Sequence, residues 1–125
     1  MQKGIKILIV EDEAITAMYL QMRLKKLSYE VVKPVGSGEN AIQVAQQECP
    51  NFILMDIGLA GKLDGIQTAR EILQFSDAYI IFMSGYNDDE LREQVKLLQP
   101  SSFLLKPIGV NDIVGIIEMQ QKEAS

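Results

Sequence analysis

The chain has 125 residues, of which 47% are hydrophobic and 23% are charged, and this balance predicts one globular domain over residues 1–125. The net charge of −5 argues against direct binding to nucleic acid or to an anionic membrane surface, because both require excess positive charge. The absence of histidine excludes Ser-His-Asp triads and histidine metal sites, and the single cysteine, Cys49, excludes an intrachain disulfide. Carboxylate, hydroxyl, lysine and backbone groups remain as the chemistry of this chain.

Two hydrophobic periodicities alternate along the sequence, one typical of strands and the other of helices. The strand pattern occurs five times, at Ile5–Val10, Tyr29–Val35, Phe52–Met55, Tyr79–Met83 and Phe103–Leu105. A helical pattern follows each strand, with inward-facing residues Ala17, Leu20, Leu24 and Leu27, then Ile42, Ala45 and Cys49, then Ile66, Ala69 and Leu73, then Leu91, Val95 and Leu98, and finally Val110, Ile113 and Ile117. The sequence therefore predicts five strand–helix units.

Strands that alternate with helices pair in parallel through right-handed crossovers. The second strand contains Pro34, which lacks the amide donor that an interior strand needs, so this strand is expected at an edge of the sheet. An edge position for the second strand favours an α/β, flavodoxin-like, doubly wound parallel sheet of order 2-1-3-4-5 with five helices. At the fourth helix, Asn87 with Glu90 three residues later resembles a capping pair.

Polar side chains stand at the ends of the first, third, fourth and fifth predicted strands. In a doubly wound sheet the ligand lies beyond the carboxyl ends of the strands, where the strand order reverses. The residues expected there are Glu11, Asp12, Asp56, Ser84 and Lys106. Three carboxylates in one cleft disfavour each other's ionisation, so a divalent cation such as Mg2+ is expected beside them. Lys106 adds a positive charge and Ser84 a hydroxyl, and both groups can bind a phosphoryl oxygen.

Any one of these residues alone is explained as a solvated loop residue, but their common place at four strand ends favours a functional site. The stretches that carry them read ILIVEDE, ILMDIGLAGKLDG, IFMSGY and FLLKP, in this order. From Ile5 to about Met119 the chain resembles the receiver domain of two-component response regulators, of the kind found in chemotaxis regulators. The resemblance implies a phospho-accepting domain of a signalling phosphorelay.

The resemblance also assigns roles by position. Asp56 matches the aspartate that accepts a phosphoryl group from the phosphohistidine of a histidine kinase or phosphotransfer protein. Asp12, Asp56 and the backbone carbonyl of Gly58 match the groups that hold Mg2+, with Glu11 one shell further out. Such a domain assists only its own phosphorylation and dephosphorylation, so it is not expected to be an enzyme.

Further matched positions concern the response to phosphorylation. Lys106 matches the lysine that contacts the phosphoryl group, and its bond to Pro107 is expected to be cis. Ser84 matches the hydroxyl that moves to the phosphate, and Phe103 the aromatic switch that then turns inward. The expected binding face for a downstream protein combines the fourth helix, the fifth strand and the fifth helix.

A signal-peptide pattern is lacking and the apolar runs are too short to span a bilayer, so a cytoplasmic location without membrane binding is expected.

Three features depart from the common family pattern. The loop after Asp56 is one residue longer and lacks the usual proline; the switch aromatic is Phe103 rather than tyrosine; and Ser101 and Ser102 replace two aspartates that the DNA-binding branch uses in dimer contacts. Slow self-dephosphorylation, over minutes or longer, is expected because Gly58 has no side chain to orient a water molecule and Tyr86 is bulky enough to shield the phosphate.

Two other classes of function are weaker alternatives. Gly36, Gly38 and Ala41 match a dinucleotide-binding fingerprint by spacing, although they also fit a tight turn capped by Ser37. An aspartate-nucleophile phosphatase would need a second acid where Gly58 stands.

Three smaller expectations concern side chains outside the site. Cys49 is expected to pack on a helix face, Met18 and Met22 to fill gaps beside the first helix or meet a partner, and Arg92 with Lys96 to form a solvated face.

Overall fold

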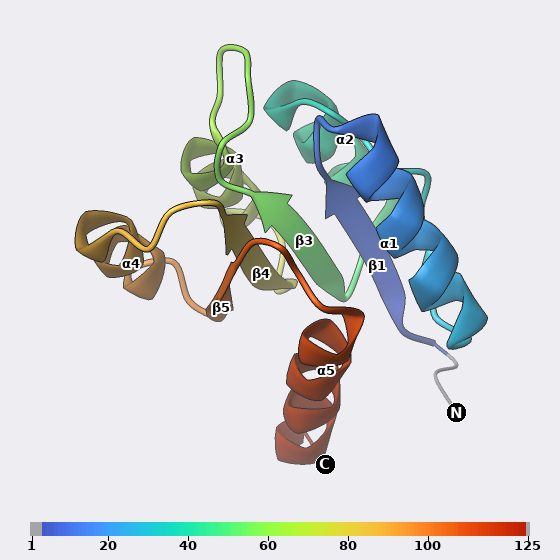
Figure 1. Ribbon diagram of the computed structural model, residues 1–125. Helices are drawn as coiled ribbons and strands as arrows, with labels where there is room; N and C mark the ends of the chain where they lie inside the picture. Colours follow the sequence, from blue (N-terminus) through green and yellow to red (C-terminus); the bar gives the residue numbers. More distant parts are fainter. Residues whose placement is uncertain (1–3, 125) are drawn as a thin grey trace.

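The computed structural model describes residues 4–124, which form a five-stranded parallel sheet with helices on both faces (Figure 1). The strand order is β2-β1-β3-β4-β5, as the sequence predicts. The strands are β1 (Lys6–Val10), β2 (Glu30–Val31), β3 (Phe52–Asp56), β4 (Tyr79–Ser84) and β5 (Ser101–Leu105). The helices are α1 (Ala14–Lys26), α2 (Gly38–Glu48), α3 (Gly65–Ile72), α4 (Asp89–Lys96) and α5 (Val110–Ala124).

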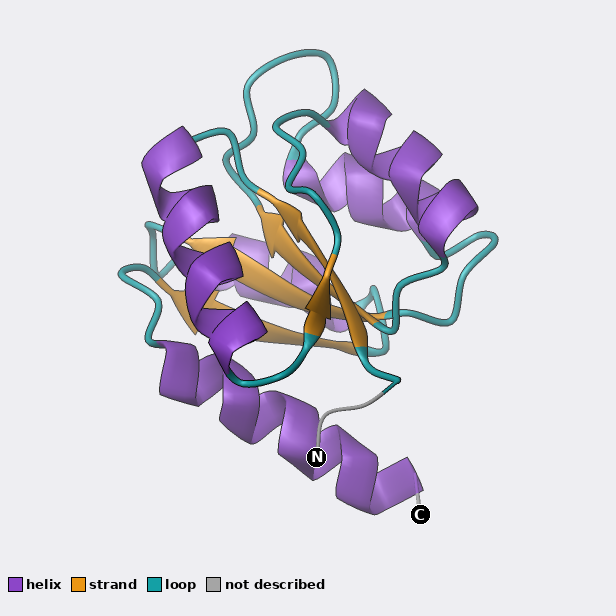
Figure 2. Ribbon diagram, turned by 90° about the vertical axis from the view of Figure 1, so that its right-hand side faces the viewer, coloured by secondary structure: helices purple, strands orange, loops and turns teal. Residues whose placement is uncertain are grey.

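The two faces of the sheet carry separate apolar clusters, because successive side chains of a strand point to opposite faces. In β1, Ile7 and Ile9 pack with α1 and α5, whereas Leu8 and Val10 pack with α2, α3 and α4. Figure 2 shows the sheet enclosed between these two helical layers. A sheet buried on both faces requires continuous apolar strands, which explains the runs in β1, β3 and β4.

The second strand is much shorter than the predicted Tyr29–Val35. It pairs with β1 only over Glu30 and Val31, and Val35 rejoins through an isolated bridge to Val10. Pro34 stands just before that bridge and has no amide hydrogen for a ladder. The predicted length is therefore wrong, but the predicted edge position is confirmed.

Several helix details also differ from the predictions. Leu27 is the C-cap of α1 and is 42% exposed, so it does not belong to the inward stripe. Cys49 is the exposed C-cap of α2, in a left-handed conformation, rather than a packing residue. The N-cap of α4 is Asp88, whose carboxylate accepts hydrogen bonds from the amides of Glu90 and Leu91, so the predicted cap at Asn87 is wrong.

Tight packing between α2 and α3 explains the glycines that resemble a dinucleotide-binding fingerprint. Ser37 caps α2 by accepting a hydrogen bond from the Asn40 amide at 3.2 Å. A Cβ atom on Gly38 would collide with the Thr68 hydroxyl and would lie 2.9 Å from the Leu63 Cβ. Gly38 is thus required for the contact between α2 and α3, which favours the turn interpretation over cofactor binding.

Among the described residues, no helix is long and apolar enough to cross a membrane.

Candidate functional site

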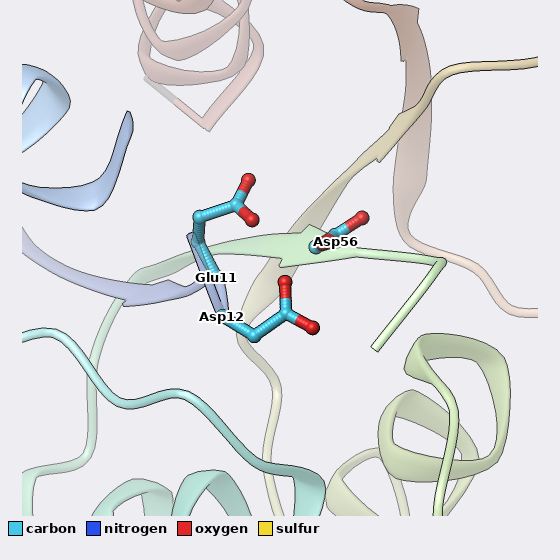
Figure 3. A group of neighbouring side chains, drawn as sticks. All are labelled: Glu11, Asp12 and Asp56. Atoms are coloured by element: carbon cyan, nitrogen blue, oxygen red, sulfur yellow. The ribbon is translucent and has the colours of Figure 1, made fainter. Parts of the chain in front are cut away.

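The carboxyl ends of β1, β3 and β5, which lie at the same edge of the sheet, bring the predicted site together. Glu11 and Asp12 directly follow β1, Asp56 ends β3, and Lys106 directly follows β5. Figure 3 shows the three carboxylates facing a common space, and one oxygen of each lies within 4.8 Å of the others. Residues 45 positions apart meet because parallel strands end at the same edge of the sheet. This placement confirms the predicted acidic cluster.

Lys106 connects two of the carboxylates. Its Nζ lies 3.1 Å from Glu11 Oε1 and 3.2 Å from Asp56 Oδ1. Burial alone would lower the pKa of Lys106, but the hydrogen bonds and charges of Glu11 and Asp56 outweigh it and raise that pKa. Lys106 is therefore positively charged and aimed at the Asp56 carboxylate.

Glu11 shows that the cluster holds more negative charge than it can easily stabilise. Burial removes water from its carboxylate, and the nearby Asp56 adds repulsion. These effects exceed the opposing hydrogen bonds from the Glu13 amide and Lys106, and the pKa of Glu11 rises to about 7. A cation beside the cluster would relieve this repulsion.

Two backbone amides of the segment after β3 bind the aspartates. The amide of Gly58 donates to Asp56 Oδ1 at 3.0 Å, and the amide of Ala60 donates to Asp12 Oδ2 at 3.2 Å. Asp56 is buried whereas Asp12 is exposed, so the cluster opens to solvent on the Asp12 side. Three carboxylates with one lysine leave a net negative, oxygen-only donor set that fits a hard cation such as Mg2+.

Ser84 ends β4 beside the cluster, but its hydroxyl is engaged elsewhere. Ser84 Oγ donates to the Tyr86 carbonyl at 3.1 Å and accepts from the Tyr86 amide at 3.0 Å. The side chain of Tyr86 is 76% exposed. Tyr86 therefore does not cover Asp56 in this state, and the shielding inferred from its bulk would require the loop to move.

Phe103 lies in the middle of β5, where it is half-buried and packs against the apolar cluster that α2, α3 and α4 share with the sheet. The guanidinium of Arg92, on α4, stacks 4.5 Å from the centre of its ring, and Arg92 Nε donates to Asn87 Oδ1 at 2.8 Å. The expectation of a merely solvated Arg92 is thus wrong. Sequence reasoning missed this contact because nothing in the spacing of the two residues indicates that α4 places a cation over β5.

The substituted serines at the start of β5 make contacts within the chain. Ser101 Oγ donates to the Val95 carbonyl at 3.2 Å, and Ser102 Oγ shares a hydrogen bond with the Tyr79 hydroxyl. The bond between Lys106 and Pro107 is cis, as the resemblance implies. The phosphatase alternative needs a second acidic side chain two residues after Asp56, and Gly58 stands at that position, so nothing there favours this alternative.

A doubly wound parallel sheet has its ligand site at the carboxyl ends of the strands, and there this chain has a carboxylate cluster and a lysine. The profile of the response regulator receiver domain matches residues 7–118. The chain therefore belongs to the receiver domain family of two-component response regulators, which confirms the predicted family and fold.

Curated relatives agree with this assignment. The transcriptional regulatory protein PdtaR of Mycobacterium tuberculosis is 31% identical over 114 residues, which cover 91% of this chain and 55% of PdtaR. The alkaline phosphatase synthesis transcriptional regulatory protein PhoP of Bacillus subtilis is 31% identical over 109 residues, covering 86% of this chain and 45% of PhoP. The chain thus spans about half the length of the curated relatives it matches.

A solved structure matches over nearly its whole length. The signal receiver domain of a modulated diguanylate cyclase from Desulfovibrio desulfuricans is 32% identical, with a TM-score of 0.85, covering 96% of this chain and 98% of that one. The beryllofluoride-activated receiver domain of RstA from Klebsiella pneumoniae, at 24% identity and a TM-score of 0.82, covers 91% and 96% and shares the fold.

Proposed function

We propose that this domain accepts a phosphoryl group on Asp56 from the phosphohistidine of a histidine kinase or phosphotransfer protein. The observation that carries the proposal is the buried Asp56 carboxylate in contact with Lys106 and beside two further acids. No other described aspartate combines burial with a lysine contact and two neighbouring carboxylates. A cytoplasmic location follows from such a partner, since histidine kinases draw their phosphate from cytoplasmic ATP.

In the transfer, an Asp56 oxygen forms a bond to phosphorus while the phosphorus–nitrogen bond of the donor breaks, and the imidazole nitrogen keeps the electron pair. The reaction depends on alignment and on neutralising charge at the phosphoryl oxygens. Lys106 supplies one positive charge, and its contact with Asp56 places that charge at the acceptor. Mg2+, held by Asp12, Asp56 and the Gly58 carbonyl with Glu11 further out, would supply the second. The chain turns over no substrate of its own, so we classify it as a signalling domain and not as an enzyme.

An exposed apolar surface on α1 fits a docking role for the phosphodonor. Ile15, Met18, Tyr19 and Met22 recur at helical spacing and are 84%, 66%, 44% and 50% exposed. Met18 and Met22 thus do not fill gaps in the core. Ile15 and Tyr19 also line a groove of about 560 Å³ together with Lys106. A donor seated on this surface would reach the phosphoacceptor site, which makes it the face we assign to the donor.

After transfer, the added charge is expected to draw the Ser84 hydroxyl away from Tyr86 and toward the phosphate. Phe103 would then turn inward and reshape the face of α4, β5 and α5, to which we assign the downstream protein partner. Beryllofluoride, a mimic of the phosphoryl group, should shift amide resonances at Leu91–Leu98 and Val110–Ile117. Shifts confined to the acidic cluster would show that this coupling is absent.

The assignment of Asp56 is tested with Asp56→Asn, incubated with Mg2+ and a small phosphodonor and weighed by mass spectrometry. The parent should gain one phosphoryl group and Asp56→Asn none. Asp64→Asn is the matched control, because Asp64 lies in the same loop but caps α3 by binding the Gln67 amide. A full gain of mass by Asp56→Asn would overturn the assignment.

A further inference from the structure

The loop between β3 and α3 contacts the acidic cluster through a backbone amide. The backbone amide of Ala60 donates to Asp12 Oδ2 at 3.2 Å, across 48 positions of sequence. Figure 1 shows this loop reaching beyond the carboxyl edge of the sheet. Because the loop lacks the proline of the common family pattern, Ala60 retains an amide hydrogen at this place.

Both ends of the loop are fixed, so the Ala60 amide has a defined position. Leu59 is buried in the apolar cluster that α2, α3 and α4 share with the sheet. At the other end, Asp64 and Gln67 form a capping box at the start of α3. Between these two anchors, Gly61 and Lys62 are exposed at the tip. Docking of Leu59 therefore presents the neighbouring amide toward Asp12.

Asp12 needs such an anchor more than its neighbours do. Glu11 and Asp56 are buried and contact Lys106, whereas Asp12 is exposed. Among residues 4–124, Ala60 is the hydrogen-bond partner found for the Asp12 carboxylate. Figure 3 shows one Asp12 oxygen directed toward Asp56 and the other directed away from it. Holding Oδ2 fixes the rotation of the carboxylate and hence the direction of its second oxygen.

We propose that the Ala60 amide is a positioning group for metal binding, which keeps Asp12 Oδ2 occupied so that the other oxygen faces Asp56 and the cation. The inference rests on the proposed function, because it concerns the same metal site. Partners that orient a metal ligand contribute strongly to metal affinity. By thermodynamic reciprocity, if the docked loop strengthens metal binding, metal binding must stabilise the docked loop to the same extent.

The first test compares Mg2+ affinity by calorimetry or amide shifts in the parent, Ala60→Pro and Ala60→Ser. Proline removes the donor, whereas serine keeps it. Ala60→Pro should bind Mg2+ about tenfold more weakly, at the lower end of the effect of lost ligand-orienting partners. Ala60→Ser should bind as the parent does. An unchanged or tighter affinity in Ala60→Pro overturns the inference, since tighter binding would mean that the amide competes with the metal.

The second test needs no variant and no phosphotransfer. Lys62 is exposed at the loop tip, so a lysine-specific protease should cut after it when the loop opens. Mg2+ should slow this cut several-fold, while cleavage after Lys26, at the far end of α1, serves as the internal reference. Equal or faster cutting at Lys62 with Mg2+ overturns the inference.

The two tests also separate this inference from the proposed function. A parent that binds Mg2+ with no response to Ala60→Pro and no change at Lys62 refutes the positioning role alone. A parent that does not bind Mg2+ refutes both.

Discussion

Gly65 is the residue at which a single added methyl group should damage both stability and the phosphoacceptor. It is the first residue of α3, and its amide donates to the Ile57 carbonyl at 3.1 Å. A Cβ atom there would collide with the Asp56 carbonyl oxygen and would lie 2.7 Å from the Ile57 Cα and 2.8 Å from the Asp56 carbonyl carbon. These neighbours are backbone atoms at the end of β3, so no side-chain rotation can relieve the overlap.

The expected cost follows from that geometry. Adding a methylene or methyl group to a tightly packed region costs about 1–3 kcal/mol, and a clash with backbone belongs at the upper end, near 3 kcal/mol. For a chain of this length, 1 kcal/mol corresponds to about 4 °C in Tm, so Gly65→Ala should melt roughly 12 °C lower. Relief of the clash must also displace Asp56, which should slow phosphorylation of the folded protein about tenfold or more, because small misplacements of reacting groups are costly.

The matched control is Gly115→Ala. Gly115 lies inside α5, and a Cβ atom there would meet nothing within 4 Å. Alanine is favoured over glycine in helices, so this variant should gain about 0.5–1 kcal/mol. Thermal unfolding followed by far-UV circular dichroism measures both variants, and mass spectrometry at a temperature well below either Tm measures the rate of phosphorylation. Gly65→Ala with the Tm and rate of the parent would refute the inferred contact between α3 and the acceptor strand.

Four further predictions concern other parts of the molecule. Tyr29 has a buried hydroxyl for which no hydrogen-bond partner is found among residues 4–124, so Tyr29→Phe should raise the free energy of unfolding in urea by about 1 kcal/mol. Burial, with the charge of Glu118, also raises the pKa of Tyr29, because both disfavour the deprotonated phenol in the folded protein. The free energy of unfolding of the parent should therefore fall as the pH rises above about 10, and that of Tyr29→Phe should not fall by this route. Asp12→Ala should abolish Mg2+-dependent phosphorylation, measured by mass, while its Tm stays equal or rises, because like charge is removed. Arg92→Ala removes a cation–π contact worth about 0.5–1 kcal/mol. If that contact holds Phe103 outward, the variant should bind beryllofluoride about threefold more tightly, as measured by NMR titration. Lys96→Ala, which removes only an exposed ion pair, should leave the beryllofluoride affinity unchanged. Phosphorylated protein should decay over minutes or longer, as followed by mass, and Tyr86→Ala should decay at the parent's rate if Tyr86 stays exposed in the phosphorylated state.

Each of these predictions has a clear contrary result. Lower stability of Tyr29→Phe would show that its hydroxyl is satisfied, and a large loss of Tm in Asp12→Ala would show that the carboxylate is structural. Equal beryllofluoride affinity in Arg92→Ala would mean that its stacking does not restrain Phe103. Decay within seconds would contradict the inferred stability of the phosphate, and faster decay in Tyr86→Ala would show that the ring moves to shield it.

The architecture and the membership of the acidic cluster were predictable from the sequence alone. Periodicity repeats within a few residues, so it identifies strands and helices without knowledge of their partners. Parallel strands end at one edge of the sheet, and this rule alone brings Asp12, Asp56 and Lys106 together from three distant segments. Pro34 likewise predicted the edge position of β2, because a missing amide hydrogen is a local property.

The tertiary structure decided how those groups contact one another. The raised pKa of Glu11 depends on burial and on its distances to Asp56 and Lys106, which no spacing specifies. The Ala60 amide reaches Asp12 only because Leu59 is packed into the core. Arg92 covers Phe103 only because α4 lies against β5. Local sequence patterns determine which segments form and in what order they pair, whereas the orientation of a carboxylate or the partner of an arginine depends on packing between segments far apart in the chain.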